Sequence, residues 1–175
     1  MPNKVNLNLP GSVWTAKDTK MLASNTLASI KLRTSRGIDA NGKKFKGYST
    51  TPLYVAFRGA RLKPKGGTRR SRTGKSIFYQ GGYKQYKHDS RKRSGGRGKS
   101  AEVDLVLSGQ LMNNLVVLSA TETKFIIGLT DHVQYYGYAV NETREYLGLT
   151  NEEVDIIVEA VSIDISEKLR KKRKR

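Results

Sequence analysis

Residues 150–169, TNEEVDIIVEAVSIDISEKL, carry the clearest local signal in the chain. Thr150 and Glu153 have the spacing of a capping box, in which two side chains satisfy the first free N–H groups of a helix. Apolar residues then repeat at helical spacing: Val154, Ile157, Val158, Val161, Ile165 and Leu169. The acids come early and the bases late, which suits the helix dipole. The stretch predicts an amphipathic helix of about 20 residues that closes the fold.

The residues before this helix predict a small antiparallel sheet. Apolar runs at Val116–Leu118 and Phe125–Leu129 are separated by the polar residues Thr121–Lys124, as in a β-hairpin. Residues 103–115 begin with an alternating pattern typical of a strand and continue with a short helical turn. The segment Val133–Tyr138 has a mixed pattern, and we assign no element to it.

The N-terminal third predicts a strand, a helix and a second strand. Alternating residues 5–9 indicate a short strand or an extended arm before the turn at Pro10-Gly11. Ser12 as N-cap and Gly37 as C-cap frame a helix with an apolar stripe. Residues 53–57 then read as a strand.

The charges divide the chain into three parts. The formal net charge is +18. Arg58–Lys99 contains 15 Lys/Arg and one acid, Ser100–Leu169 contains 3 Lys/Arg and 12 acids, and Arg170–Arg175 is entirely basic. Two compatible accounts follow. The basic parts bind phosphate, or the acidic half of one copy binds the basic part of the next.

Residues 58–100 are rich in glycine and offer few aliphatic side chains to bury. Such a segment cannot offset the entropy of its own ordering. It contains an aromatic island of Phe78, Tyr79, Tyr83 and Tyr86. These rings either dock the segment onto the core or stack on nucleic-acid bases, and we favour docking.

These features predict an α+β fold: a small antiparallel sheet with N-terminal and C-terminal helices packed on it, plus a long, basic, glycine-rich arm. We expect 1–11 to be an N-terminal strand or arm. A single core domain should comprise 12–57 and 101–169. Residues 58–100 should form an extended arm ordered only against partners, and 170–175 a basic tail.

Composition excludes several classes of protein. The chain has no cysteine, so disulfides, thiolate nucleophiles and cysteine-based zinc sites are absent. No apolar run approaches the roughly 20 residues that span a bilayer. Residues 1–10 lack the apolar core of a signal peptide. We therefore expect a soluble protein, not secreted by that route, with no membrane partner.

Catalytic motifs are also missing from the sequence. Gly74-Lys75 and Gly98-Lys99 resemble phosphate-binding loops, but a Walker A loop needs a glycine five positions earlier. Arg69 and Arg93 occupy those positions. The two histidines do not pair on one helical face, and no nucleophile elbow occurs. We predict no catalytic, cofactor-binding or metal-binding residues, and no enzyme.

Three blocks resemble a known family when taken in order: RTSRGIDANGKKFKGYS at 33–49, VDLVLSGQLMNNL at 103–115, and REYLGLT at 144–150. They are similar to the signature of phage virion-morphogenesis proteins, the tail-completion or neck family to which the phage Mu G protein is related. The motif Gly82-Tyr83-x-x-Tyr86-Lys87 agrees with it. Tyr146 replaces the family's usual phenylalanine, and Thr143 stands where proline is common.

The resemblance implies a structural subunit of the phage head–tail connection. Such a subunit forms a homo-oligomeric ring, a hexamer or dodecamer, which joins the capsid portal complex to the tail. Its partners would be portal or adaptor proteins, tail proteins and, without sequence specificity, double-stranded DNA. It would lie in the virion neck, and in the host cytoplasm during assembly. The alternative is a sequence-tolerant RNA- or DNA-binding component of a ribonucleoprotein particle.

Two sets of residues are predicted to carry the contacts of such a subunit. The set expected near nucleic acid comprises Arg69, Arg70, Arg72, Arg91, Lys92, Arg93, Arg97 and Lys99. The set expected to form assembly contacts comprises Tyr79, Tyr83, Tyr86, Arg144, Tyr146 and Leu147.

Overall fold

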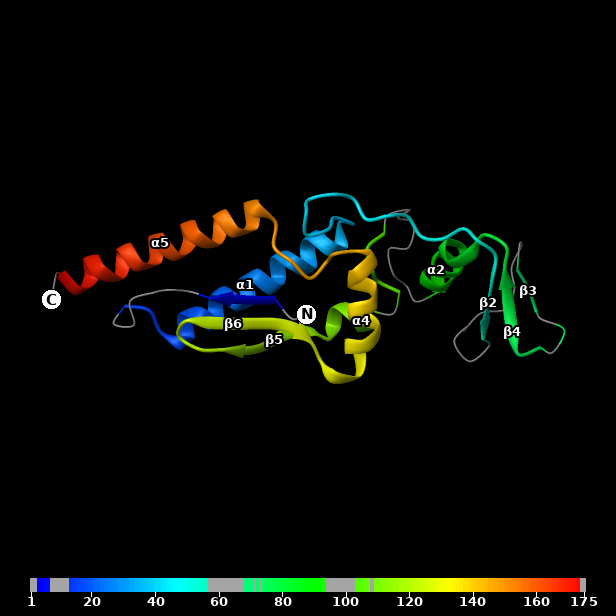
Figure 1. Cartoon of the computed structure of the whole chain (residues 1–175), viewed down its shortest axis with the longest axis horizontal. Coiled ribbons are helices and arrows are strands. Elements are labelled where there is room, and N and C mark those ends of the chain that lie inside the picture. The colour runs from blue at the N-terminus through cyan, green and yellow to red at the C-terminus, as the bar shows by residue number, and fades with distance from the viewer. Residues whose placement is uncertain are drawn as a thin grey trace. The chain divides into compact units, whose positions relative to one another are not determined.

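The computed structural model describes residues 3–6, 13–56, 68–70, 72, 74–93, 103–107 and 109–173. They form helices and two small antiparallel sheets, so the predicted α+β class is confirmed. The chain divides into two compact units (Figure 1). We call Met1–Phe45 together with Asp104–Arg175 the core unit. We call Lys46–Val103 the basic unit, because its sequence holds 16 Lys/Arg and only two acids.

Helix α1, Ala16–Ser35, is the first helix of the core unit. Its N-cap is Thr15, whose backbone N–H donates to the Asp18 carboxylate at 2.9 Å, while its hydroxyl accepts from the Asp18 backbone N–H at 3.4 Å. This capping box satisfies two free N–H groups at once. The predicted N-cap, Ser12, lies outside the described residues. Gly37 follows the helix with a φ of 78°, a conformation that glycine adopts without strain.

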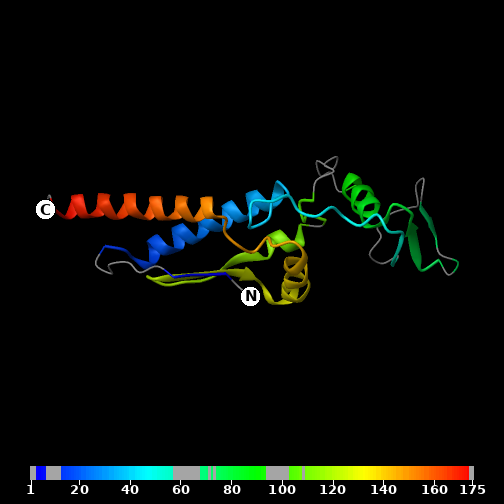
Figure 2. The ribbon, with the colours of Figure 1, turned by 45° about the horizontal axis from the view of Figure 1, so that its top comes forward.

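A three-stranded antiparallel sheet lies at the centre of the core unit, in the order β1-β6-β5. Strands β5, Leu115–Ala120, and β6, Lys124–Leu129, form the predicted hairpin. The short N-terminal strand is also confirmed, although β1, Asn3–Asn6, begins two residues early. Figure 2 shows α1 between this sheet and the C-terminal helix α5, Asn151–Arg173. The interior includes four side chains that are almost completely buried: Ile30, Leu115, Phe125 and Leu129.

The sequence predicted the region of helices α3 and α4 only in part. Helix α3, Gln110–Asn113, is the predicted helical turn. The alternating residues 103–107 do not form a strand, because Leu105 adopts a φ of 53° and turns the chain. Helix α4, Asp131–Thr143, occupies the segment left unassigned. The pattern of apolar and polar residues did not indicate this helix, because most of its tyrosines face outward. Tyr135 is 92% exposed.

Helix α5 begins at the predicted capping box. The Thr150 backbone N–H donates to Glu153 Oε2 at 2.9 Å, and the Glu153 N–H donates to Thr150 Oγ1 at 3.1 Å. The helix runs antiparallel to α1. Lys168 lies 2.7 Å from Asp18 at one end, and Glu153 pairs with Arg33 at the other. Of the described residues of α5, Val161 alone is buried, so α1 covers only part of the predicted apolar stripe.

The basic unit contains a second three-stranded antiparallel sheet, in the order β2-β4-β3. Its strands are β2, Leu53–Ala56, β4, Ser76–Tyr79, and β3, Thr68–Arg70. Helix α2, Gly82–Arg93, follows β4 directly. A small hydrophobic cluster is built on buried Ile77 and Tyr79, with the partly buried Val55 and Tyr86 packed against them.

This unit corrects the predicted organisation of the chain. Residues 58–100 were expected to be an extended arm, yet β3, β4 and α2 lie within them. Strand β2 was expected in the core domain but pairs with β4. Large aromatic side chains bury enough area to build a small core where aliphatic residues are few. Residues 58–67, 71, 73 and 94–100 of the predicted arm lie outside the described residues. At the other end of the chain, 170–173 continue α5 and do not form a separate tail.

Candidate functional site

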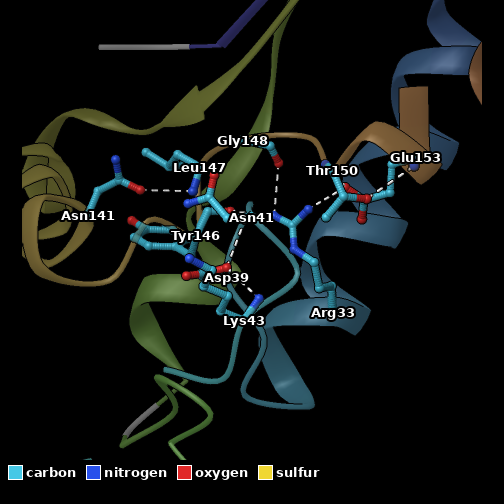
Figure 3. Close-up of polar contacts among 10 residues, drawn as sticks. All are labelled: Arg33, Asp39, Asn41, Lys43, Asn141, Tyr146, Leu147, Gly148, Thr150 and Glu153. Atoms are coloured by element: carbon cyan, nitrogen blue, oxygen red, sulfur yellow. Dashed lines mark hydrogen bonds and ion pairs between the residues drawn. The ribbon is translucent and has the colours of Figure 1, made fainter. Parts of the chain in front are cut away.

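Arg33 joins two of the family-like blocks in the core unit (Figure 3). Its side chain is only 8% exposed and forms an ion pair with Glu153. Its Nη2 group donates to the backbone carbonyls of Tyr146 at 3.0 Å and Gly148 at 2.8 Å. The planar guanidinium thus ties the end of α1 to the loop before α5, and it matches three acceptors at once.

The turn after α1 contacts the same loop. The Asp39 carboxylate accepts from the backbone N–H groups of Asn41 and Lys43, each at 2.8 Å. The Asn41 side chain donates to Glu145 Oε2 at 2.7 Å, and Figure 3 shows Asn41 and Asp39 beside this loop. A Cβ added at Gly148 would lie 2.5 Å from the Ala40 Cβ. The first and third blocks are therefore packed together without spare space.

Tyr146 anchors the third block inside the core unit. The side chain is fully buried, and its hydroxyl donates to the Gly137 carbonyl at 3.2 Å. Gly137 has no room for a larger residue, because an added Cβ would lie 2.1 Å from Leu129 Cδ1. The neighbouring Leu147 is held by a bond from its N–H to Asn141 Oδ1 at 2.8 Å. The buried tyrosine is accommodated because its hydroxyl has this acceptor.

Burial dominates the electrostatics of this cluster. Desolvation lowers the pKa of Arg33 from its ordinary value, while the charges of Glu153 and Asp39 act in the opposite direction. Desolvation also raises the pKa of the Tyr146 hydroxyl strongly, so it stays a neutral donor. These shifts describe a structural cluster: the cation is matched to an acid and the hydroxyl to a carbonyl.

The predicted assembly contacts need correction at three positions. Tyr79, Tyr146 and Leu147 are buried inside their own units, so their side chains are not available to a partner in this structure. Their signature positions reflect packing instead. Arg144, Tyr83 and Tyr86 are half-buried, and their assembly role stays a prediction.

The tyrosines of the basic unit pack mainly on one another. The ring centroid of Tyr83 is 5.2 Å from that of Tyr48 and 5.9 Å from that of Tyr86. The ring centroids of Tyr86 and Tyr79 are 5.3 Å apart. Lys87 is buried, donates to the Tyr48 hydroxyl and lies 4.1 Å from the centre of that ring. Three of the four aromatic residues singled out in the sequence thus build this unit's interior.

The fourth, Phe78, lies on the opposite face of the sheet with a residue that the sequence did not single out. Tyr54 is directly opposite Phe78 in the β2–β4 ladder, and their ring centroids are 4.9 Å apart. Tyr54 is 56% exposed. The alternation of Leu53 and Val55 with Tyr54 was a readable signal that Tyr54 faces away from the interior. Its partner could not be identified without the strand register.

The residues predicted near nucleic acid all belong to the basic unit. Arg69 and Arg70 are on β3, and Arg91, Lys92 and Arg93 form the end of α2. Arg72 lies between β3 and β4 and is exposed. Arg97 and Lys99 lie outside the described residues. Arg69, Arg70 and the three residues at the end of α2 thus lie on two elements that each contact β4. Their contact with nucleic acid stays a prediction.

The described residues contain no cluster of side chains suited to bind a metal ion. Within them, no group of three or more His or acidic side chains could hold a metal ion. His88 lies 3.2 Å from Asp89, its neighbour in sequence, and His132 is exposed. In the described part of the chain, no helix is both long and apolar enough to cross a membrane.

Comparisons of the chain with protein-family models, with curated proteins and with solved structures found no match. The family resemblance of the three blocks therefore rests on their residues and order alone.

Proposed function

We propose that the chain is a non-enzymatic, ring-forming subunit of the phage head–tail connection, which binds portal or adaptor proteins and tail proteins. The three family-like blocks suggest this role. The compact packing of the first and third blocks supports this role. Their residues hold the fold together, which is what we expect of sequence blocks in a structural subunit. The proposal also places the chain in the virion neck, with its basic residues near double-stranded DNA.

The observation that carries the proposal is the apolar surface of α5. Val154, Val158 and Leu169 follow one helical stripe beside the contact with α1, and Ile156 and Ile163 lie on a different side of the helix. All five are between 41% and 59% exposed. Exposed aliphatic side chains that recur on one side of a helix are candidates for an interaction site. Two separate stripes suit a ring subunit, which uses different surfaces toward its two neighbours.

Charge supports the same arrangement. The first half of α5 carries the acids Glu152, Asp155 and Glu159, and its last turns carry Arg170–Arg173. Opposite charges at the rim of an apolar contact set its orientation and speed association. Identical subunits could therefore align α5 with a neighbour in one direction only.

The test measures assembly of the full chain by size-exclusion chromatography with light scattering, alone and with a purified portal or adaptor protein. We expect a closed oligomer of the wild type. Val158→Asp should remain folded but fail to assemble, because it places a charge in the apolar stripe. The matched control is Tyr135→Asp on α4, which also adds an acid at an exposed aromatic position and should assemble normally. A wild type that stays monomeric and binds neither partner would refute the proposal.

The second candidate is a sequence-tolerant RNA- or DNA-binding component. The specific observation in its favour is the outward aromatic pair Tyr54–Phe78 in a unit with 16 Lys/Arg. Tight, strongly salt-dependent binding of nucleic acid by a monomer that joins no ring would favour this candidate.

A further inference from the structure

We propose that the outer face of the β2-β4-β3 sheet is a binding site for single-stranded nucleic acid, with Tyr54 and Phe78 stacking on its bases. This site goes beyond a subunit contact or a general attraction to duplex DNA. It does not depend on ring formation, so it can stand or fall separately from the function proposed above.

The two faces of this sheet have opposite characters. Side chains alternate along a strand, so residues paired across an antiparallel ladder share a face. Val55 pairs with Ile77, and both belong to the hydrophobic cluster of the unit. Tyr54 pairs with Phe78 on the other face. The interior of the basic unit therefore uses one face and leaves the aromatic pair on the other.

The aromatic pair has the character of a binding surface and not of a core. The rings are tilted by 50° at a centroid separation of 4.9 Å. Tyr54 is more than half exposed, whereas Tyr79 on the inner face is 1% exposed. Exposed aromatic rings on a sheet are the platform on which single-stranded nucleic acids stack, since every base offers a π-face.

Basic residues lie near this pair in the ladder and in the sequence. Arg69 is directly opposite Phe78 in the β3–β4 ladder, so the register places Tyr54, Phe78 and Arg69 in one row across the three strands. Arg72 and Lys75 are exposed in the segment between β3 and β4. The unit as a whole holds 16 Lys/Arg against Asp89 and Glu102. A polyanion is the partner that such a charge excess attracts most strongly.

The combination of rings and cations favours a single strand over other polyanions. In a duplex the base faces are stacked on one another, so Tyr54 and Phe78 would gain nothing from them. An acidic protein would satisfy the cations but offers no flat partner for the exposed ring of Tyr54 and the half-buried ring of Phe78. Only an unstacked strand offers phosphates and base faces together.

The test uses the full chain and a fluorescently labelled oligothymidylate of about 12 nucleotides, within the usual site size for such surfaces. Fluorescence anisotropy would compare it with an abasic strand of equal length and with a duplex of equal phosphate number. Wild type should bind oligothymidylate at least about tenfold more tightly than the abasic strand. Tyr54→Ala should lose this preference and bind both strands with the abasic affinity.

Matched variants separate stacking from charge and from folding. Tyr54→Phe keeps the ring and should keep the preference. Tyr135→Ala removes an exposed tyrosine of the core unit and should leave binding unchanged. Tyr54→Trp supplies a second readout, because its emission should be quenched by oligothymidylate and not by the abasic strand. Equal affinity of wild type for all three nucleic acids, or an unchanged preference in Tyr54→Ala, would overturn the proposal.

Discussion

The buried ion pair of Arg33 and Glu153 offers the sharpest test of how the core unit is held together. Replacing Arg33 by methionine keeps an unbranched side chain of similar reach but removes the charge and every donor. The change leaves the Glu153 carboxylate without its cation and the carbonyls of Tyr146 and Gly148 without their donor. All of these groups lie where α1 meets the start of α5 (Figure 3).

The expected magnitude follows from the geometry. Removing one partner of a buried pair costs about 3–5 kcal/mol. Glu153 is 13% exposed and keeps its bond from the Thr150 N–H, so the carboxylate is not stranded completely. We therefore expect a loss of about 3 kcal/mol, a large share of the roughly 5–15 kcal/mol that stabilises an ordinary domain.

Urea titration followed by tryptophan fluorescence measures this loss. Trp14, the chain's single tryptophan, is buried in the core unit and reports on that unit. With a urea dependence of about 2 kcal/mol per molar, the midpoint should fall by about 1.5 M. Arg170→Met, at an exposed arginine of α5, is the control and should change stability by less than about 0.5 kcal/mol.

The double variant Arg33→Met/Glu153→Met makes the test specific for an unpaired charge. It should be less destabilised than Arg33→Met alone, because an apolar pair leaves no buried carboxylate behind. Two results would refute the reasoning. One is a loss of stability below about 1 kcal/mol in Arg33→Met, and the other is a loss in the double variant equal to the sum of the losses in the two single variants.

Three further predictions concern the same unit. Gly137→Ala places a methyl group 2.1 Å from Leu129 Cδ1 and should cost about 1–3 kcal/mol in the same urea titration; an unchanged midpoint would contradict this. Thr150→Ala removes the hydroxyl that caps α5 and should cost about 1 kcal/mol, with a smaller far-ultraviolet helix signal. The hydrogen bond from Lys168 is the main cause that lowers the pKa of Asp18 below its ordinary 3.8, so this group stabilises the fold above that value and loses its effect as pH falls through the lowered pKa. The stability difference between wild type and Asp18→Asn should therefore close as pH falls through this lowered pKa, whereas a difference that persisted in stronger acid would show another origin.

Local signals in the sequence predicted the elements whose cause is itself local. The capping box at Thr150 and Glu153 and the hairpin of β5 and β6 both follow from residues a few positions apart. Helix α4 was not predicted because its apolar residues do not follow a helical period. Val133 is buried while Tyr135 is exposed, so apolar side chains lie on both sides of the helix.

The basic unit was missed for a different reason. Its sheet pairs Val55 with Ile77, residues separated by a long basic stretch, so no local window contains both. The composition correctly indicated that few aliphatic residues are available there. We underestimated how much buried surface the aromatic side chains contribute. Tyr79 and Tyr86 supply much of the small interior. The same non-local pairing creates the Tyr54–Phe78 row, which therefore could not be predicted without the register.

The structure changes which residues can carry a function. The family-like blocks drew attention to Arg33, Tyr146 and Gly148, but these form a closed structural cluster with few groups left for a partner. A partner must instead be recognised by surface that the fold leaves exposed. The α5 stripes and the Tyr54 face are such surfaces, and they lie in different units. Val158→Asp should therefore abolish assembly without changing the preference for oligothymidylate, and Tyr54→Ala should do the reverse. Loss of both properties in either variant would mean that nucleic-acid binding and assembly share one surface, which would contradict two separate binding surfaces.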